Sequence, residues 1–142
     1  MNDQTVFELI HAMEQVTNRM IIKWNQSFNE GLGISHILLL SHLKHDGKMK
    51  PIDLAESLGI APSSISHLIQ KLSKRDYIKR IPDLNDKRIS YLEITDEGLE
   101  VLKKAAEDGH QLQKNTFAQL TNEEIKQLLA IYQKLNLTLD QM

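Results

Sequence analysis

Two short strand-like runs that directly follow an apolar helical stripe limit the fold of this chain more than any other feature. Residues 78–94 read IKRIPDLNDKRISYLEI, with a turn-forming stretch around Asp86 between the two runs. In residues 62–74 the apolar side chains recur at the spacing of a helix that buries one face. The sequence therefore predicts a helix followed at once by a hairpin whose tip carries Lys87 and Arg88.

Apolar residues at helical spacing also lie on both sides of this unit. Ser35 suits the N-cap of one helix, and Pro51 and Pro62 suit the first turns of two others. Thr121 and Glu124 have the spacing of a capping box. The predicted order is helix 6–28, helix 35–46, helix 51–58, helix 62–74, hairpin 78–94, a helix capped by Thr95 and a last helix capped by Thr121. The expected fold class is mainly α with a small β-hairpin.

The composition predicts one soluble globular domain. A chain of 142 residues fits a single domain with a sizeable core. It has no apolar run near the roughly 20 residues that a membrane span needs, and no secretory signal is visible. Because there is no cysteine, disulfides, thiolate metal clusters and cysteine redox switches are excluded. We therefore expect a cytoplasmic location, no membrane partner, no cofactor and no bound metal.

The positive charge of the chain is concentrated in one window. Residues 71–88 contain seven Lys or Arg and three Asp, a local charge of +4, whereas the rest of the chain carries −6 and the total is −2. Phosphate binding depends on where positive charge lies rather than on the total. A solvated charged surface is the alternative, so the charge only supports an argument made from other features.

The predicted helices 51–58 and 62–74, joined by a tight turn at Gly59, have the layout of a helix-turn-helix. If the apolar stripe of the second helix is buried, its outer face is small and polar at first and basic further along. Small hydroxyls let a helix enter the major groove of DNA, where Ser, His and Gln hydrogen-bond base edges. The predicted DNA-binding residues of this helix are Ser63, Ser66, His67 and Gln70 at the bases, Lys71 and Lys74 at or near phosphates, and Ser64.

The hairpin tip adds cations beside this helix. Arg88 at the tip of a ribbon suits the narrow, electronegative minor groove, and Lys87 adds charge next to it. Asp86 is expected to pair with Arg88 or with a neighbouring cation and to hold it in place. The alternative is a turn that is merely made soluble by its charges, and the preceding helix pair favours the DNA-binding interpretation.

Residues 34–102 resemble the winged helix-turn-helix core of the MarR-type bacterial transcription regulators. The wing signature Asp-x-Arg, followed by Leu-x-Ile-Thr-x-x-Gly at the start of a helix, is fairly specific when both occur together. The matching stretches are DLAESLGI at 53–60, SISHLIQKL at 64–72, IKR at 78–80, DKR at 86–88 and LEITDEG at 92–98.

This resemblance implies a winged helix-turn-helix core flanked by N- and C-terminal dimerisation helices. It divides one compact chain into a dimerisation helix at 1–33, a DNA-binding region at 34–98 and further dimerisation helices at 99–142. The implied partners are a second copy of the chain and double-stranded DNA with a pseudo-palindromic operator. The implied activity is repression that a small-molecule effector releases.

The chain departs from the family pattern at both ends of the predicted recognition helix. Ala61 stands where the family commonly has Ser or Thr, which removes a side-chain cap that contributes about 1 kcal/mol. Pro62 compensates in part by presetting the first turn. Asp76 stands where the family commonly has Gly after the helix, and Asp tolerates the left-handed conformation better than most residues.

Members of the family often respond to small aromatic or phenolic compounds bound between the dimer helices and the DNA-binding unit. By that resemblance, the expected effector-binding residues are Trp24, Phe28, Ile34, His36 and Leu40. The alternative is that these large residues only build the core.

Three other functional classes are alternatives to this interpretation. A zinc-responsive regulator of the same fold is one alternative, because His42 and His45, and Glu107 and His110, have workable ligand spacings on predicted helices. A winged helix that contacts protein instead of DNA is another, although it has no need for cations at the wing. No catalytic motif or residue is found, so the chain is not expected to be an enzyme.

Overall fold

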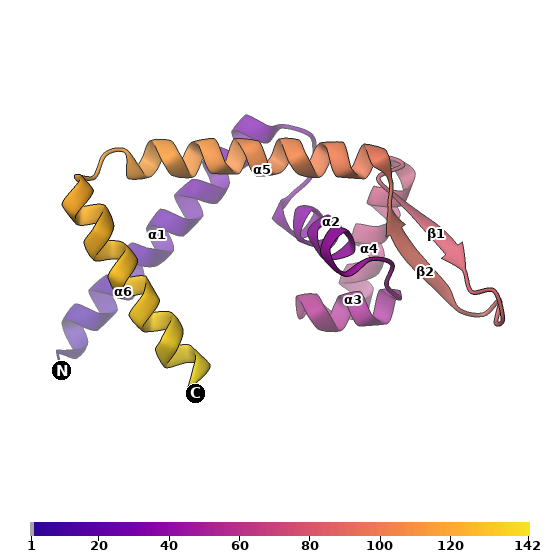
Figure 1. Ribbon diagram of the computed structural model, residues 1–142, viewed down its shortest axis with the longest axis horizontal. Helices are drawn as coiled ribbons and strands as arrows, with labels where there is room; N and C mark the ends of the chain where they lie inside the picture. Colours follow the sequence, from indigo (N-terminus) through magenta and orange to yellow (C-terminus); the bar gives the residue numbers. More distant parts are fainter. Residues whose placement is uncertain (1) are drawn as a thin grey trace.

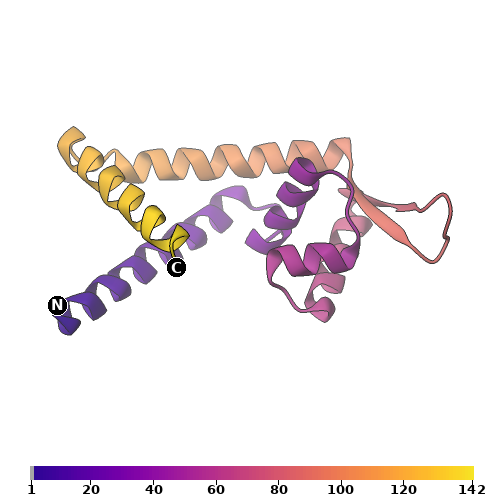
Figure 2. The ribbon, with the colours of Figure 1, turned by 60° about the horizontal axis from the view of Figure 1, so that its bottom comes forward.

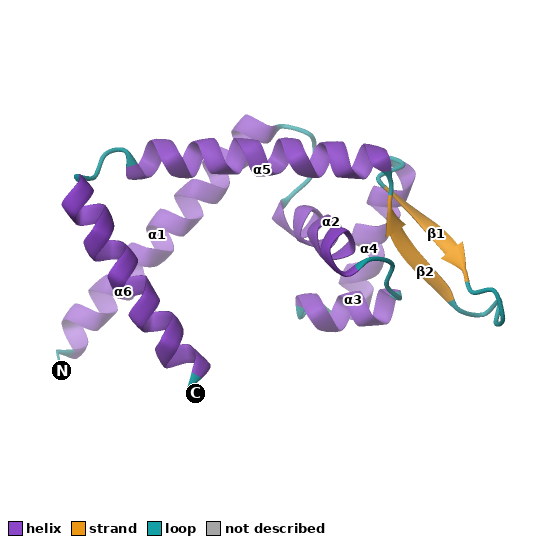
Figure 3. Ribbon diagram, in the orientation of Figure 1, coloured by secondary structure: helices purple, strands orange, loops and turns teal. Residues whose placement is uncertain are grey.

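Residues 2–142, which the computed structural model describes, fold in the predicted order of helices and hairpin (Figure 1, Figure 3). The elements are α1 (Asp3–Phe28), α2 (Ile34–Asp46), α3 (Pro51–Leu58), α4 (Pro62–Lys74), β1 (Ile78–Pro82), β2 (Ser90–Ile94), α5 (Asp96–Phe117) and α6 (Asn122–Asp140). The predicted class, mainly α with a small hairpin, is confirmed. None of the helices within residues 2–142 combines the length and the apolar composition that crossing a membrane requires.

Helix α5 runs along the length of the molecule and joins its two ends (Figure 1). Helices α2, α3 and α4 and the hairpin gather at the start of α5, and α6 turns back from its other end. Figure 2 shows the same arrangement from a second direction. The C-terminal end of α1 meets α5, and toward the N-terminus of α1 the two helices diverge. One end of the molecule is therefore compact, and the other consists of long helices standing apart.

The hydrophobic core lies inside the compact end and at the crossing of α1 with α5. The rings of Trp24 and Phe28 stack with centroids 5.0 Å apart, and the indole Nε1–H of Trp24 donates to the carbonyl of Ala105 at 3.0 Å. Helix α6, by contrast, has no buried residue. The core residues are Trp24, Phe28, Leu32, Leu39, Leu40, Leu43, Leu54, Ala55, Ile65, Ile69, Leu72, Ile78, Leu92, Val101, Leu102 and Ala105.

The predicted helix caps are confirmed at two of three positions. Thr95 accepts the backbone N–H of Gly98 at 3.0 Å, and Thr121 and Glu124 form the reciprocal capping box. The prediction for Ser35 was wrong, because α2 begins at Ile34 and its N-cap is Gly33, two residues before Ser35. A glycine has no capping side chain.

The two strands pair in antiparallel register from Ile78 with Ile94 to Pro82 with Ser90. A third segment joins them, because Met49 and Leu92 exchange backbone hydrogen bonds of 3.1 and 2.7 Å. The sequence did not predict this bridge, since a single paired residue leaves no alternating pattern. The bridge ties the α2–α3 connection to the middle of β2.

The start of α5 lies directly against the chain segment that leaves α4. A Cβ atom added to Gly98 would lie 2.2 Å from the carbonyl oxygen of Tyr77 and 2.7 Å from Cγ1 of Ile94. The backbone oxygen cannot move aside without disturbing the hairpin. Position 98 therefore requires a residue without a side chain.

Gly98→Ala should lower the free energy of unfolding by about 1–3 kcal/mol or more, because the added methyl overlaps backbone atoms. Gly109→Ala is the matched control in the same helix, where the added Cβ would meet the ring of Trp24 at an ordinary 3.6 Å. That change should stabilise the helix by about 0.5–1 kcal/mol. Urea denaturation of both variants measures the difference, and equal stability would contradict the close approach at Gly98.

Candidate nucleic-acid interface

Helix α4 presents the polar face that the sequence predicted. Ile65, Ile69 and Leu72 are buried on its inner side, and the left-handed Gly59 turns the chain between α3 and α4. The Ser66 hydroxyl donates to the carbonyl of Pro62 at 3.0 Å, so its oxygen remains free to accept a hydrogen bond. The exposed residues of this face are Ser63, Ser64, Ser66, His67, Gln70 and Lys74.

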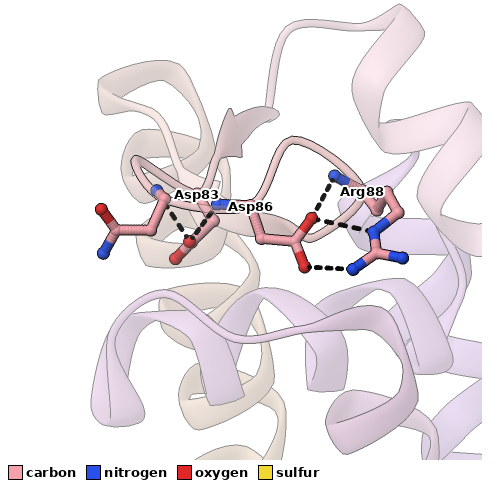
Figure 4. Close-up of polar contacts among 4 residues, drawn as sticks. Asp83, Asp86 and Arg88 are labelled. Atoms are coloured by element: carbon pink, nitrogen blue, oxygen red, sulfur yellow. Dashed lines mark hydrogen bonds and ion pairs between the residues drawn. The ribbon is translucent and has the colours of Figure 1, made fainter.

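The wing tip between the strands is held by its own aspartates (Figure 4). One carboxylate oxygen of Asp83 accepts the backbone N–H groups of Asn85 at 3.1 Å and Asp86 at 2.9 Å. The loop closes further through Ile89, whose N–H donates to the Asp86 carbonyl at 3.1 Å. The loop is therefore built as an Asx turn rather than as an open connection.

The Asp86 carboxylate accepts three hydrogen bonds from Arg88, so the predicted pairing of these two residues is present (Figure 4). The Arg88 backbone N–H donates at 3.0 Å, and its Nε and Nη2 donate to the two carboxylate oxygens at 3.1 Å each. The Arg88 side chain is nevertheless 91% exposed. The guanidinium is thus held in one orientation while its outer edge faces solvent.

The electrostatics of the pair keep both groups charged. Hydrogen bonds from the Arg88 side chain, and then from its backbone, lower the pKa of Asp86. The Asp86 carboxylate raises the pKa of Arg88 in turn. Because the folded Asp86 pKa is depressed, the pairing is present at neutral pH and is lost only as pH falls through that low pKa.

Lys71, which the sequence predicts at or near a phosphate, contacts the chain's own backbone in this structure. Its ammonium donates to the carbonyl of Gly31, and Arg75, one turn further along α4, donates from Nη1 to the carbonyl of Glu30. The Glu30 carboxylate pairs with Lys104 of α5. We call these contacts the loop clasp, and they tie the C-terminal half of α4 to the α1–α2 connection and to α5.

Arg75 was missed by the sequence reasoning. Its partners are backbone carbonyls of a loop about 45 residues away, and backbone groups leave no pattern in a sequence. Leu84 was also missed, although it stands at 99% exposure on the wing beside the Asp83 turn. Nothing in the structure explains this exposed leucine.

The two departures from the family pattern have the expected structural outcomes. Helix α4 has no side-chain cap at Ala61, and Pro62 occupies its first turn. Asp76 adopts a left-handed φ of 61°, and its carbonyl accepts the Thr95 hydroxyl at 2.6 Å. A residue that tolerates this conformation is therefore sufficient here, and glycine is not required.

The five expected effector-binding residues divide between a pocket and the core. Trp24 and Ile34 line a pocket of about 240 Å³ between α1, α2 and α5. Phe28 and Leu40 do not line it, because they are 1% and 0% exposed inside the core. Large apolar side chains at helical spacing also build cores, and these two residues lie in the core. His36 lies beside the α1–α2 connection, where its Nδ1 accepts the Gly33 N–H at 3.0 Å.

The histidine spacings considered for zinc form no cluster. Within residues 2–142, no three His, Cys, Asp or Glu side chains lie close enough together to hold a metal ion. His42 lies 3.4 Å from Asp46 on the next turn of α2.

Sequence comparisons match the chain to one family. The MarR family profile matches residues 32–90. The transcriptional repressor MprA of Escherichia coli (strain K12) is 32% identical over 117 residues, which cover 82% of this chain and 65% of MprA. The HTH-type transcriptional repressor MdtR of Bacillus subtilis is 26% identical over 106 residues, which cover 75% of this chain and 68% of MdtR. The chain spans about two thirds of the length of these relatives.

Solved structures share the fold over nearly the whole chain. YusO of Bacillus subtilis has a TM-score of 0.80 at 23% identity, covering 96% of this chain and 97% of YusO. A MarR variant from E. coli in complex with operator DNA has a TM-score of 0.72 at 17% identity, covering 92% of this chain and 95% of that one. These likenesses show a winged helix-turn-helix with long flanking helices.

The buried surroundings of His36 predict a pH dependence of stability. Burial lowers the pKa of His36, and the charges of Lys71 and Arg75 lower it further. The unfolded chain, with a histidine pKa of about 6.5, therefore binds more protons than the folded chain once pH falls through that value. Wild-type protein should lose unfolding free energy between about pH 7.5 and 5.5.

His36→Gln should lose less over the same range, because its amide oxygen can accept the Gly33 N–H without titrating. His45→Gln replaces an exposed histidine of the same helix and is the matched control, with the wild-type dependence expected. Urea denaturation across the pH range measures all three proteins. Parallel curves for wild type and His36→Gln would contradict the assignment.

Proposed function

The chain belongs to the MarR family, and from this premise we propose that it is a sequence-specific DNA-binding transcriptional regulator that acts as a homodimer. The observation that carries the proposal is the combination of two surfaces on one compact unit. One is the exposed polar face of α4, and the other is the wing on which Asp86 holds an exposed Arg88. A helix for the major groove beside a cationic ribbon for the minor groove suits duplex DNA.

The proposed contacts follow from exposure and chemistry. Ser63, Ser64, Ser66, His67 and Gln70 read base edges from α4, since each is exposed and carries a short or planar polar group. Lys74 lies at a phosphate. Arg88 enters the minor groove, with Lys87 adding charge beside it. The Lys71 ammonium donates to the Gly31 carbonyl within the loop clasp, and we expect it to keep that contact when DNA binds.

The proposed dimer forms through the terminal helices, residues 1–33 and 99–142. Apolar side chains stand exposed on both α1 and α6, far more than single scattered residues would give. A twofold axis would bury these faces against their copies and present two α4 helices to a pseudo-palindromic operator. The exposed apolar residues are Val6, Phe7, Leu9, Ile10, Met13, Val16 and Ile22 on α1, and Ile125, Leu129, Ile131, Tyr132, Leu135, Leu137 and Leu139 on α6.

Repression with release by an effector is the proposed mode of action. MprA and MdtR, the sequence relatives, are transcriptional repressors. The pocket lined by Trp24 and Ile34 lies between the long helices and α2, so a small apolar or aromatic molecule bound there would act on both parts. Its binding would release DNA only if it favoured a different arrangement of the two α4 helices.

The proposal is tested by fluorescence anisotropy with duplex DNA from upstream of this protein's gene, against scrambled DNA at two salt concentrations. Salt-sensitive binding that prefers the upstream DNA by about 10³-fold or more is expected. Absence of binding at low salt would favour a winged helix that contacts protein.

Arg88→Ala should weaken upstream binding by about 1–3 kcal/mol and leave the dimer intact. Lys126→Ala on α6 is the matched control, and an Arg88→Ala affinity equal to the control would refute the role of the wing.

Lys74 and Lys71 should differ in how they affect the salt dependence of binding. Lys74→Ala should flatten the slope of log affinity against log salt by about 0.9, the value of one phosphate contact. Lys71→Ala should leave that slope nearly unchanged, because its ammonium bonds to Gly31. Equal slope changes for the two variants would show that Lys71 leaves the loop clasp to meet a phosphate.

A further inference from the structure

Leu84 stands exposed at the far end of the wing. Within residues 2–142 no large apolar side chain is more exposed, since 99% of its surface meets solvent. Figure 1 and Figure 2 both show the hairpin projecting from the helices, with its loop pointing away from the rest of the chain. The fold therefore gives this side chain no role of its own, and any partner of it lies outside the chain.

The loop that carries Leu84 is closed by hydrogen bonds. One step beyond the last strand pair, the Asp83 N–H donates to the Ile89 carbonyl at 3.0 Å. Leu84 and Arg88 are the next residues inward, so they stand on opposite arms of one short loop. The Asp83 carboxylate accepts the N–H groups of the two residues that follow Leu84, at 3.1 and 2.9 Å. The apolar side chain and the guanidinium are thus presented together by an ordered turn.

These two side chains differ in what they can recognise on DNA. Asp86 engages Nε and Nη2 of Arg88, which leaves Nη1 on the outer edge of the guanidinium as a donor. The minor-groove floor of an A·T pair carries only acceptors, whereas a G·C pair adds the N2 amine of guanine, a donor. Leu84 has no acceptor, so it would leave that amine without a partner. The combination of Leu84 and Arg88 therefore favours A·T pairs.

The surroundings of Leu84 favour a narrow groove over a protein surface as its partner. Apolar contact sites for proteins are patches of several residues. The loop residues that follow Leu84, from Asn85 to Arg88, are all polar or charged. The minor groove is about 6 Å wide, and proteins that bind it insert single apolar side chains such as leucine. An isolated leucine beside an arginine matches such a slot.

We propose that Leu84 enters the minor groove opposite Arg88, packs against the deoxyribose walls and makes the wing prefer A·T over G·C pairs. The inference rests on the proposed function, because it requires the wing to meet duplex DNA. It adds a specificity-determining residue that carries no charge and no hydrogen-bonding group.

The probe for the test is a duplex that the wild-type protein selects from a randomised pool. Leu84→Asn should bind this duplex about 10-fold more weakly, because the apolar contact is lost. Leu84→Met is the matched control and should bind nearly as the wild type does, since its volume and polarity are similar. The slope of log affinity against log salt should be the same for all three proteins, because Leu84 releases no counterion. Equal affinity of Leu84→Asn and wild type, or a flatter slope in Leu84→Asn, would overturn the proposal.

Thermal unfolding separates this role from a structural one. Leu84→Asn should unfold at the wild-type temperature, because the side chain that it replaces is almost fully exposed. A clearly lower midpoint, or a change of oligomeric state, would show that Leu84 serves the fold or the contact between copies and would overturn the proposal.

The preference for A·T is tested by base substitution beneath the wing, at the sugars that Leu84→Asn leaves newly open to hydroxyl-radical cleavage. Replacing one A·T pair there by G·C should weaken wild-type binding about 10-fold, and I·C, which lacks the amine, should restore it. Leu84→Asn should discriminate less, because its amide oxygen can accept from the amine. Binding of I·C as weak as that of G·C, or wild-type discrimination by Leu84→Asn, would overturn the assignment. A pool that yields no selected duplex would instead refute DNA binding itself, and with it this inference.

Discussion

The junction at which α4, the hairpin and α5 meet determines how the parts of this molecule are oriented. Thr95 is bonded to three partners there: its hydroxyl donates to Asp76 and accepts from Gly98, and its N–H donates to Tyr77 at 3.0 Å. Because Gly98 has no side chain, α5 can begin against the backbone that leaves α4. The direction of the long helix, the root of the wing and the end of α4 are therefore fixed by a few adjacent hydrogen bonds.

Most of the fold was predictable because its signals are local. Pro62, Thr95 and the Thr121–Glu124 capping box each act within one helical turn. The residues that interact are therefore close together in the sequence as well as in the structure. The bridge from Met49 to Leu92 and the loop clasp were not predictable, since their partners are backbone groups of distant segments. Phe28 and Leu40 show the same limit in another form: a helical stripe tells which face is apolar but not whether that face meets a core or a cavity.

The two surfaces of the candidate interface are prepared in different ways. The wing is ordered by its own side chains, so the Arg88 guanidinium loses little further freedom when it meets a partner. The polar face of α4 consists of short, exposed side chains, so their positions are set by the position of the α4 backbone. Lys71 and Arg75 hold α4 in position by donating to carbonyls of the loop after α1, which links α4 to the long helices.

Helix α6 buries none of its nineteen residues within a single chain. Most of the stability of a helix in a protein comes from packing of its apolar face, and a second copy of the chain would supply that surface in the proposed dimer. In the proposed dimer, the folding of this segment and the association of two subunits become one bimolecular process. At low subunit concentration, the dimer concentration then rises with the square of the subunit concentration. Operator occupancy therefore depends steeply on how fast the cell synthesises the protein.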